Sequence, residues 1–419
     1  MTRRAPFRLA LAVLAVLVLS VPAAAATGRW APGTAIELQG TLGDAPYRVK
    51  VPGNWNGTLL VFAHGYGRSA TQPIPITPNY GSAGQEQFFL DRGYALAASA
   101  YSRPGWAVKE GIQETLALAN WFKGHVGMPM TTVLWGRSMG SVVAMESLER
   151  FPGAYDGVIP MCAVGAGSPR AFDGAMAVAV AYDAAFGWPA AWGPIDDVRD
   201  DISFNTDVVP LLVGQLMNPA NIGRFEFIRL VSRLPASGFY SPPTALEAPF
   251  LFQVMFFATE GRAELERRAG GNPVQNLDHS YTLGAGEQAY LGAFGVDANA
   301  LLASMNAKRT ISAERNARNW LEHYATYTGT FRRPAIALWG IHDGLVPAFH
   351  ASAYRETVKD PGLYLDGFAD SPGHCNYSDV QLLEIVTKME SWITTGVKPA
   401  PLSAPGIVPG YVPAPFPVP

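Results

Sequence analysis

The strongest constraint on the fold is a series of short, almost entirely apolar runs that alternate with helical segments. The first four runs are Gly57–Gly65, Tyr94–Tyr101, Thr131–Gly136 and Tyr155–Val164. Runs of this length that are apolar on both faces are typical of strands buried inside a parallel sheet. The segments between them have helical periodicity, as in Ala107–Val126. This alternation predicts an α/β fold, with a mostly parallel sheet and helices on both faces.

Both ends of the chain contribute to the predicted sheet. Thr34–Leu42 and Ala45–Pro52 alternate between apolar and polar residues on either side of Gly-Asp, which predicts a β-hairpin. Two late apolar runs, Arg333–Gly340 and Leu363–Phe368, predict further strands, and Asp379–Thr394 predicts a last helix. The sheet is therefore expected to combine early and late segments of the sequence.

The alternation stops in the middle of the chain. Segments there such as Asp173–Phe186 and Phe250–Arg268 favour helices, and Gly- and Pro-rich stretches link them. A chain of 419 residues also exceeds the roughly 250–300 residues of one compact domain, so an insertion is expected. We predict one core from residues 27–165 and 331–395, with residues 166–330 as a mainly helical cap over the carboxyl edge of the strands.

The sequence G-R-S-M-G, Gly136–Gly140, joins a predicted strand to a predicted helix. It follows Thr131–Gly136 directly and opens the helical segment Met139–Phe151. A strand–turn–helix of this kind is the setting that a nucleophile elbow requires, because the tight turn exposes the serine and leaves no room for side chains beside it. The helix amino terminus also directs N–H groups at developing negative charge. The alternative is an ordinary tight turn.

This motif, its setting and the alternation of strands and helices resemble the α/β-hydrolase family, over about residues 34–165 and 333–395. In that family the nucleophile, the acid and the base follow in the order Ser, acid, His. The resemblance implies Ser138 as nucleophile and Asp343, directly after the strand Arg333–Gly340, as acid. It implies His374, in the loop S-P-G-H-C-N-Y before the last helix, as base.

Other residues compete for the roles of acid and base. Asp366 lies within a strand pattern, Asp370 lies close to the His374 loop, and an Asp before Gly, such as Asp343, often only forms a turn. His350 falls on a predicted helix and is the alternative base. The remaining histidines are His64, His125, His279, His323 and His342.

The segment H-G-Y-G, His64–Gly67, follows the first buried run and resembles the oxyanion turn of the family. The resemblance implies the backbone N–H groups of Tyr66 and Met139 as the two oxyanion donors. We interpret His64 as a structural histidine that shapes this turn.

Cys162 ends one predicted strand, and Cys375 follows the predicted base. Both are expected at the carboxyl edge of the sheet, where a disulfide between them is sterically plausible. Tannase- and feruloyl-esterase-like hydrolases, which this His-Cys pair resembles in part, also have a Cys directly after the catalytic His. Their partner Cys precedes the Ser, where this chain has Arg137. The alternative is two unpaired thiols.

The two ends of the chain differ from the rest in composition. Residues 1–26 contain a basic segment, an apolar segment and a small-residue site, which predicts a signal peptide and a secreted or periplasmic protein. A retained membrane anchor is the alternative, although the apolar part is short for a span of about 20 residues. Residues 396–419 are rich in proline and almost uncharged, which predicts a disordered, polyproline-like tail outside the fold.

Together these features predict a secreted serine hydrolase that cleaves carboxylic esters, on a small-molecule or polymeric substrate. A serine peptidase with the same triad and a non-catalytic binding protein on this fold are the alternatives. The formal net charge of −3 argues against a nucleic-acid partner, and no residue spacing predicts a metal or a cofactor. No stable membrane insertion is expected, and the sequence leaves the oligomeric state open. Some aromatic residues of the cap are expected to line an apolar pocket. The candidates are Trp188, Trp192, Phe239, Tyr240 and residues 249–257.

Overall fold

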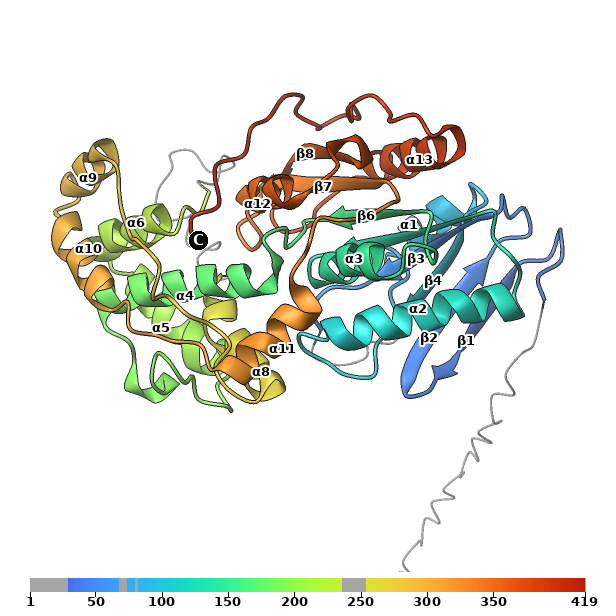
Figure 1. The fold of residues 1–419 in the computed structure, drawn as a ribbon. Coiled ribbons are helices and arrows are strands. Elements are labelled where there is room, and N and C mark those ends of the chain that lie inside the picture. Colours follow the sequence, from blue (N-terminus) through green and yellow to red (C-terminus); the bar gives the residue numbers. More distant parts are fainter. Residues whose placement is uncertain (1–28, 68–73, 80–81, 236–253, 419) are drawn as a thin grey trace, which may run out of the picture.

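The computed structural model describes residues 29–67, 74–79, 82–235 and 254–418 (Figure 1). The predicted signal peptide and the cap aromatics Phe239 and Tyr240 lie outside the described residues, as do residues 249–253. Within the described part, no helix is long and apolar enough to cross a membrane.

Eight strands of the described chain form one sheet in the order β1-β2-β4-β3-β5-β6-β7-β8 (Figure 1). The predicted hairpin forms β1 and β2, and β2 also pairs antiparallel with β4. All other pairs are parallel. The strands are Ile36–Leu42 (β1), Ala45–Val51 (β2), Thr58–Ala63 (β3), Ala95–Ser99 (β4), Thr131–Arg137 (β5), Gly157–Met161 (β6), Ala335–His342 (β7) and Tyr364–Pro372 (β8).

Helices cover both faces of this sheet, because its central strands are apolar on both sides. Leu59 and Val61 of β3 point into one hydrophobic cluster, while Leu60 and Phe62 point into the other. The first face is covered by α2 (Val108–His125), α3 (Met139–Arg150) and α12 (Phe349–Thr357). The opposite face is covered by α1 (Ala83–Leu90) and α13 (Asp379–Thr395).

The described residues between 166 and 330 form a helical layer beside the sheet (Figure 1). Its helices are α4 (Gly167–Phe186), α5 (Val209–Leu216), α6 (Ile222–Val231), α8 (Glu260–Ala269), α9 (Ala285–Gly292), α10 (Ala298–Ala307) and α11 (Arg315–Ala325). Short single-turn helices connect them at Ala190–Trp192, Phe204–Val208 and Pro219–Asn221, and a further one, Pro361–Leu363, precedes β8. The predicted α/β fold, a mostly parallel sheet with helices on both faces and a mainly helical insertion, is confirmed.

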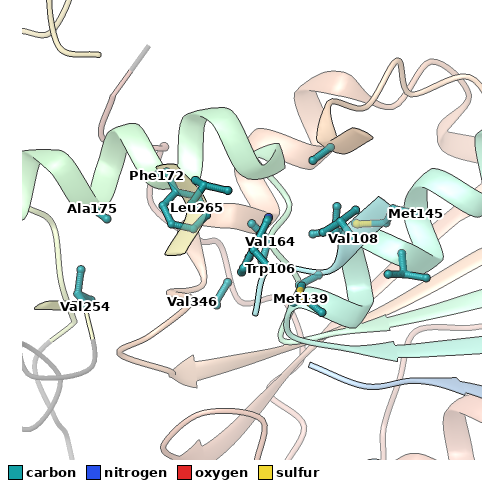
Figure 2. Close-up of a cluster of buried hydrophobic side chains, with 14 of the residues drawn as sticks. Trp106, Val108, Met139, Met145, Val164, Phe172, Ala175, Val254, Leu265 and Val346 are labelled. Atoms are coloured by element: carbon teal, nitrogen blue, oxygen red, sulfur yellow. The ribbon is translucent and has the colours of Figure 1, made fainter. Parts of the chain in front are cut away.

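One continuous hydrophobic cluster contains residues of both the cap and the core. Figure 2 shows Phe172 and Ala175 of α4 on one side and Met139 and Met145 of α3 on the other, with Trp106 between them. Polar contacts also join the two parts. Trp106 N donates to Glu264 of α8 at 2.9 Å, and Arg268 of α8 bonds Glu110 of α2 at 3.0 Å. The cap therefore shares its core with one face of the sheet.

The prediction of a disordered tail outside the fold is wrong. Residues 396–418 are extended but pack in turn along α13, β8 and α12. Val408 N donates to Phe368 O at 2.8 Å, and Asp370 N donates to Gly406 O at 2.7 Å, so the segment covers the edge strand of the sheet. Within the segment, Leu402 buries its side chain in the hydrophobic cluster on the α13 face of the sheet. Proline removes donors from such a segment but leaves its carbonyls and apolar side chains available for packing.

Helix α3 carries a carboxyl group in its buried stretch. Every residue from Met139 to Leu148 is buried, including Glu146. Arg150 Nε donates to Glu146 Oε2 at 2.7 Å, whereas Oε1 has no hydrogen-bond partner in the described structure. Burial raises the pKa of Glu146 to about 8, in spite of the opposing effect of Arg150.

We predict that Glu146 makes the free energy of unfolding fall as pH rises from about 4.5 towards 8. In that range Glu146 keeps a proton in the folded state that it has released in the unfolded state. The free energy of unfolding therefore falls by at most about 1.4 kcal/mol per pH unit. Urea unfolding across this range should show a shallower fall for Glu146→Gln. The exposed Glu356→Gln on α12 is the control. Equal slopes in Glu146→Gln and the unsubstituted protein would contradict the prediction.

Candidate active site

Ser138 occupies the sharp turn between β5 and α3. Its backbone φ is 55°, in the left-handed region that a serine rarely adopts. Ser138 N donates to Met161 O of the neighbouring strand β6 at 3.1 Å, which ties the turn to the sheet edge. The residue is 8% exposed, lines a pocket and directly follows β5, so it lies at the carboxyl end of that strand.

The two glycines of G-R-S-M-G are required by close backbone contacts. A Cβ at Gly136 would lie 2.0 Å from Gly140 O, and a Cβ at Gly140 would lie 2.0 Å from Ala63 O of β3. Real side chains cannot approach backbone oxygen so closely, because this is far inside van der Waals contact. The close packing of α3 against β3 and β5 therefore holds Ser138 in its strained turn.

The structure brings Asp343 and His374 together at the ends of β7 and β8. Asp343 is completely buried, and its Oδ1 accepts hydrogen bonds from Leu345 N and Val346 N, both at 2.9 Å. Its Oδ2 lies 2.7 Å from His374 Nδ1. A carboxylate only accepts hydrogen bonds, so Nδ1 carries the imidazole proton and Nε2 is left with its lone pair.

His374 Nε2 lies 3.2 Å from Cys375 Sγ. Among the described residues, no hydrogen bond joins His374 to Ser138 in this structure. The sulfur is part of a disulfide and has no proton to donate, so Nε2 keeps its accepting capacity.

The competing acids have partners of their own. Asp366 forms two hydrogen bonds with Arg355, at 2.8 and 2.9 Å, and Asp370 Oδ1 lies 2.9 Å from His342 Nε2. Neither carboxylate is bonded to His374 in the described structure. Of these three described acids, Asp343 is the one placed to orient that imidazole.

His350 shares the Ser138 pocket, although the sequence placed it only on a helix. Its ring is buried, and Ala166 N donates to Nδ1 at 3.3 Å. Burial, together with the charge of Arg170, lowers the pKa of His350 to about 3. Because Nδ1 already accepts a hydrogen bond, this imidazole is a neutral polar group in the pocket wall.

The predicted oxyanion segment lies at the carboxyl end of β3. Burial lowers the pKa of His64, whose Nδ1 lies 2.7 Å from Gly65 O and whose ring stacks on Tyr101 at 3.9 Å. These contacts belong to a histidine that shapes the turn. The ring of Tyr66 packs edge-on against Phe256 and Phe257 of the cap, at 5.4 and 5.9 Å. Met139, the other predicted donor, opens α3 directly after Ser138.

A mostly apolar pocket, with a cavity volume of about 60 Å³, lies between the cap and the sheet edge. Ser138, Ser232 and His350 are the polar residues in its described lining, and no charged residue lines it. Of the predicted cap aromatics, Phe257 lines the pocket, whereas Trp188 and Trp192 pack around Tyr182 inside the cap. The larger apolar lining residues are Trp106, Val164, Phe172, Val178, Leu234, Val254, Leu345, Val346, Phe349 and Phe416.

Two lining residues, Phe416 and Pro417, come from the proline-rich end of the chain and were missed by the sequence analysis. A bulky apolar residue, Phe416, stands among prolines that prevent a helix or a central strand. This pattern could have indicated an extended segment that packs against the fold.

Cys162 and Cys375 form a disulfide, with Cα atoms 5.3 Å apart. The bond joins the end of β6 to the residue after His374, across 213 positions of sequence. Potential metal-ligating atoms of Cys162, Asp343, His374 and Cys375 lie within 4.8 Å of one another, which is the one such group in the described chain. Disulfide sulfurs are not thiolates, so this group does not offer four metal donors.

Comparison with known proteins finds similarity only among solved structures. No protein-family model matches the chain, and no curated protein matches it. Feruloyl esterase B from Aspergillus oryzae is 12% identical, with 87% of this chain and 82% of that chain covered and a TM-score of 0.41. Proline iminopeptidase from Mycobacterium smegmatis is 13% identical, with coverage of 86% and 97% and a TM-score of 0.37. Epoxide hydrolase A from Mycobacterium thermoresistibile is 17% identical, with coverage of 86% and 98% and a TM-score of 0.36. Similarity at this level identifies neither an activity nor a substrate.

We predict that the disulfide stabilises the fold and fixes the His374 loop. Replacing Cys162 and Cys375 together by Ala should lower the free energy of unfolding by about 2–5 kcal/mol, because the unfolded chain loses a long cross-link. The substituted protein should also be cleaved faster by protease within residues 372–378. Thermal unfolding and limited proteolysis measure the two effects, and reductant should reproduce them. Two free thiols in the native protein would contradict the assignment.

Proposed function

We propose that the protein is a secreted serine hydrolase that cleaves carboxylic esters with Ser138, His374 and Asp343. The observation that carries this proposal is the arrangement at one sheet edge. A serine in a strained, glycine-bounded turn after β5 lines a pocket, and a buried carboxylate after β7 orients a histidine after β8. A serine hydroxyl is a weak nucleophile, so this combination of groups is what its activation requires.

In the proposed reaction, Ser138 Oγ attacks the ester carbonyl while His374 Nε2 removes its proton. The imidazolium is stabilised by Asp343, and it then protonates the departing alcohol. The backbone N–H groups of Tyr66 and Met139 are the proposed donors to the oxyanion. Water, activated by the same histidine, hydrolyses the acyl-enzyme and restores Ser138. The hydrogen bond from Ser138 to His374 forms in the substrate complex, since such bonds tighten on binding.

The pocket favours an ester over a peptide as substrate. Its described lining contains neither a carboxylate to pair with a substrate amine nor a cation to pair with a carboxylate. Apolar side chains dominate it, so burial of an uncharged, apolar acyl group would supply most of the binding energy. Export through the signal peptide predicted at residues 1–26 belongs to the same proposal, and the disulfide is compatible with an oxidising compartment.

Replacing Ser138 by Ala is expected to lower kcat for a nitrophenyl ester by several orders of magnitude, since it removes the nucleophile but not the fold. A serine-directed phosphonate should label Ser138 in the unsubstituted protein and should not label the Ser138→Ala variant. Ser147→Ala is the matched control, because it makes the same change on buried α3 at a hydroxyl outside the pocket lining. A folded Ser138→Ala protein with normal hydrolysis would exclude Ser138 as nucleophile.

A second pair of variants separates the two histidines near the site. His374→Ala should lose nearly as much activity as Ser138→Ala. The reason is that replacing any one of several groups that act together in catalysis removes most of their joint effect. His350→Gln should retain the phosphonate reaction, since a neutral wall histidine takes no proton from Ser138. Steady-state kinetics and phosphonate labelling rates measure both effects. The assignment of the base fails if His350→Gln abolishes labelling and His374→Ala does not.

A further inference from the structure

The end of the described chain, residues 411–418, is a segment that we call the strap. It passes between α12 and α4, and the carboxyl-terminal mark in Figure 1 lies beside the cap. Ser352 Oγ of α12 donates to Ala414 O at 2.7 Å. On the other side, Arg170 Nη2 of α4 donates to Val418 O at 3.1 Å. The strap is thus fixed to both the core and the cap.

Three side chains from outside the strap contact the ring of Phe416 and fix its position. Its ring packs edge-on against Phe349 at 5.2 Å and against His350 at 5.0 Å. The guanidinium of Arg170 lies 4.8 Å from the centre of the same ring, in a cation–π contact. These contacts give Phe416 a defined position, in contrast to a loosely attached chain end.

The strap separates two cavities. Phe416 and Pro417 line the Ser138 pocket, while Pro417 and Val418 line a second cavity of about 30 Å³ whose other lining residues belong to the cap. Both cavities are also lined by Gly174 and Ser232. The two spaces therefore meet at the strap, and residues 416–418 form part of the wall between them.

The Ser138 pocket fits the acyl side of an ester. His374 must protonate the departing alcohol, so the alcohol lies on the His374 side of Ser138. Neither His374 nor Asp343 lines this pocket in the described structure. A group that occupies the pocket is therefore on the opposite side of the carbonyl from the alcohol.

We propose that the strap ends the acyl-binding pocket and limits the length of the apolar acyl chain that the protein accepts. This inference rests on the proposed ester hydrolysis. Removal of Phe416, or of residues 416–419, would join the Ser138 pocket to the second cavity and make room for longer chains. The proline content suits this role, since a segment with fixed backbone angles forms a firmer wall than a flexible one.

The test compares 4-nitrophenyl esters from butanoate to dodecanoate, which differ only in the acyl chain. Phe416→Ala and the deletion of residues 416–419 should raise the kcat/KM ratio of dodecanoate to butanoate about tenfold, a typical effect of pocket size. Phe416→Leu should give a smaller increase. The matched control is Tyr411→Ala, because Tyr411 packs on Phe368 at 4.9 Å and lines neither cavity. It should leave the ratio unchanged, even if it lowers the melting temperature.

Each outcome decides one of the two proposals. If the unsubstituted protein hydrolyses esters, but Phe416→Leu and the deletion keep its chain-length profile, the inference about the strap is overturned. If the protein hydrolyses no ester, the proposed function fails. Calorimetric binding of octanoate and dodecanoate to the Ser138→Ala protein then tests the strap alone. Deletion of residues 416–419 should strengthen dodecanoate binding relative to octanoate, and an unchanged ratio would overturn the inference.

Discussion

The close packing of α3 against β3 and β5 is the constraint on which the site depends. Gly140 lies so near Ala63 O, and Gly136 so near Gly140 O, that neither position has room for a Cβ. This packing forces Ser138 into a backbone conformation that it would not adopt alone, and such strain costs about 1–3 kcal/mol. The buried apolar face of α3 offsets that cost, because nearly the whole helix lies in the core.

Around this turn, buried polar contacts and one covalent bond fix the loop that follows β8. Two backbone N–H groups orient Asp343, and Asp343 in turn orients His374. The Cys162–Cys375 disulfide attaches the next residue to the end of β6. The loop is thereby held to the same sheet edge as Ser138, although more than two hundred residues separate them in sequence.

The cap and the strap give the site its apolar surroundings. Because the cap shares one hydrophobic cluster with the sheet, the pocket wall is assembled from residues that are distant in the chain. The strap adds a wall from the carboxyl-terminal end, where the proline content alone predicted disorder. Its carbonyls accept hydrogen bonds from Ser352 and Arg170, so the segment is ordered by its neighbours and not by its own secondary structure.

The sequence by itself determined the fold class, the order of strands and helices, and Ser138 as the candidate nucleophile, and it favoured Asp343 and His374 among several candidate acids and bases. These follow from local patterns, since hydrophobic periodicity and the spacing of G-R-S-M-G depend on neighbours along the chain. Tertiary structure alone decided which acid meets His374, that His350 faces the pocket, and that Phe416 closes part of it. Such contacts join segments far apart in sequence, and their geometry depends on how the whole core packs. No local pattern could therefore reveal them.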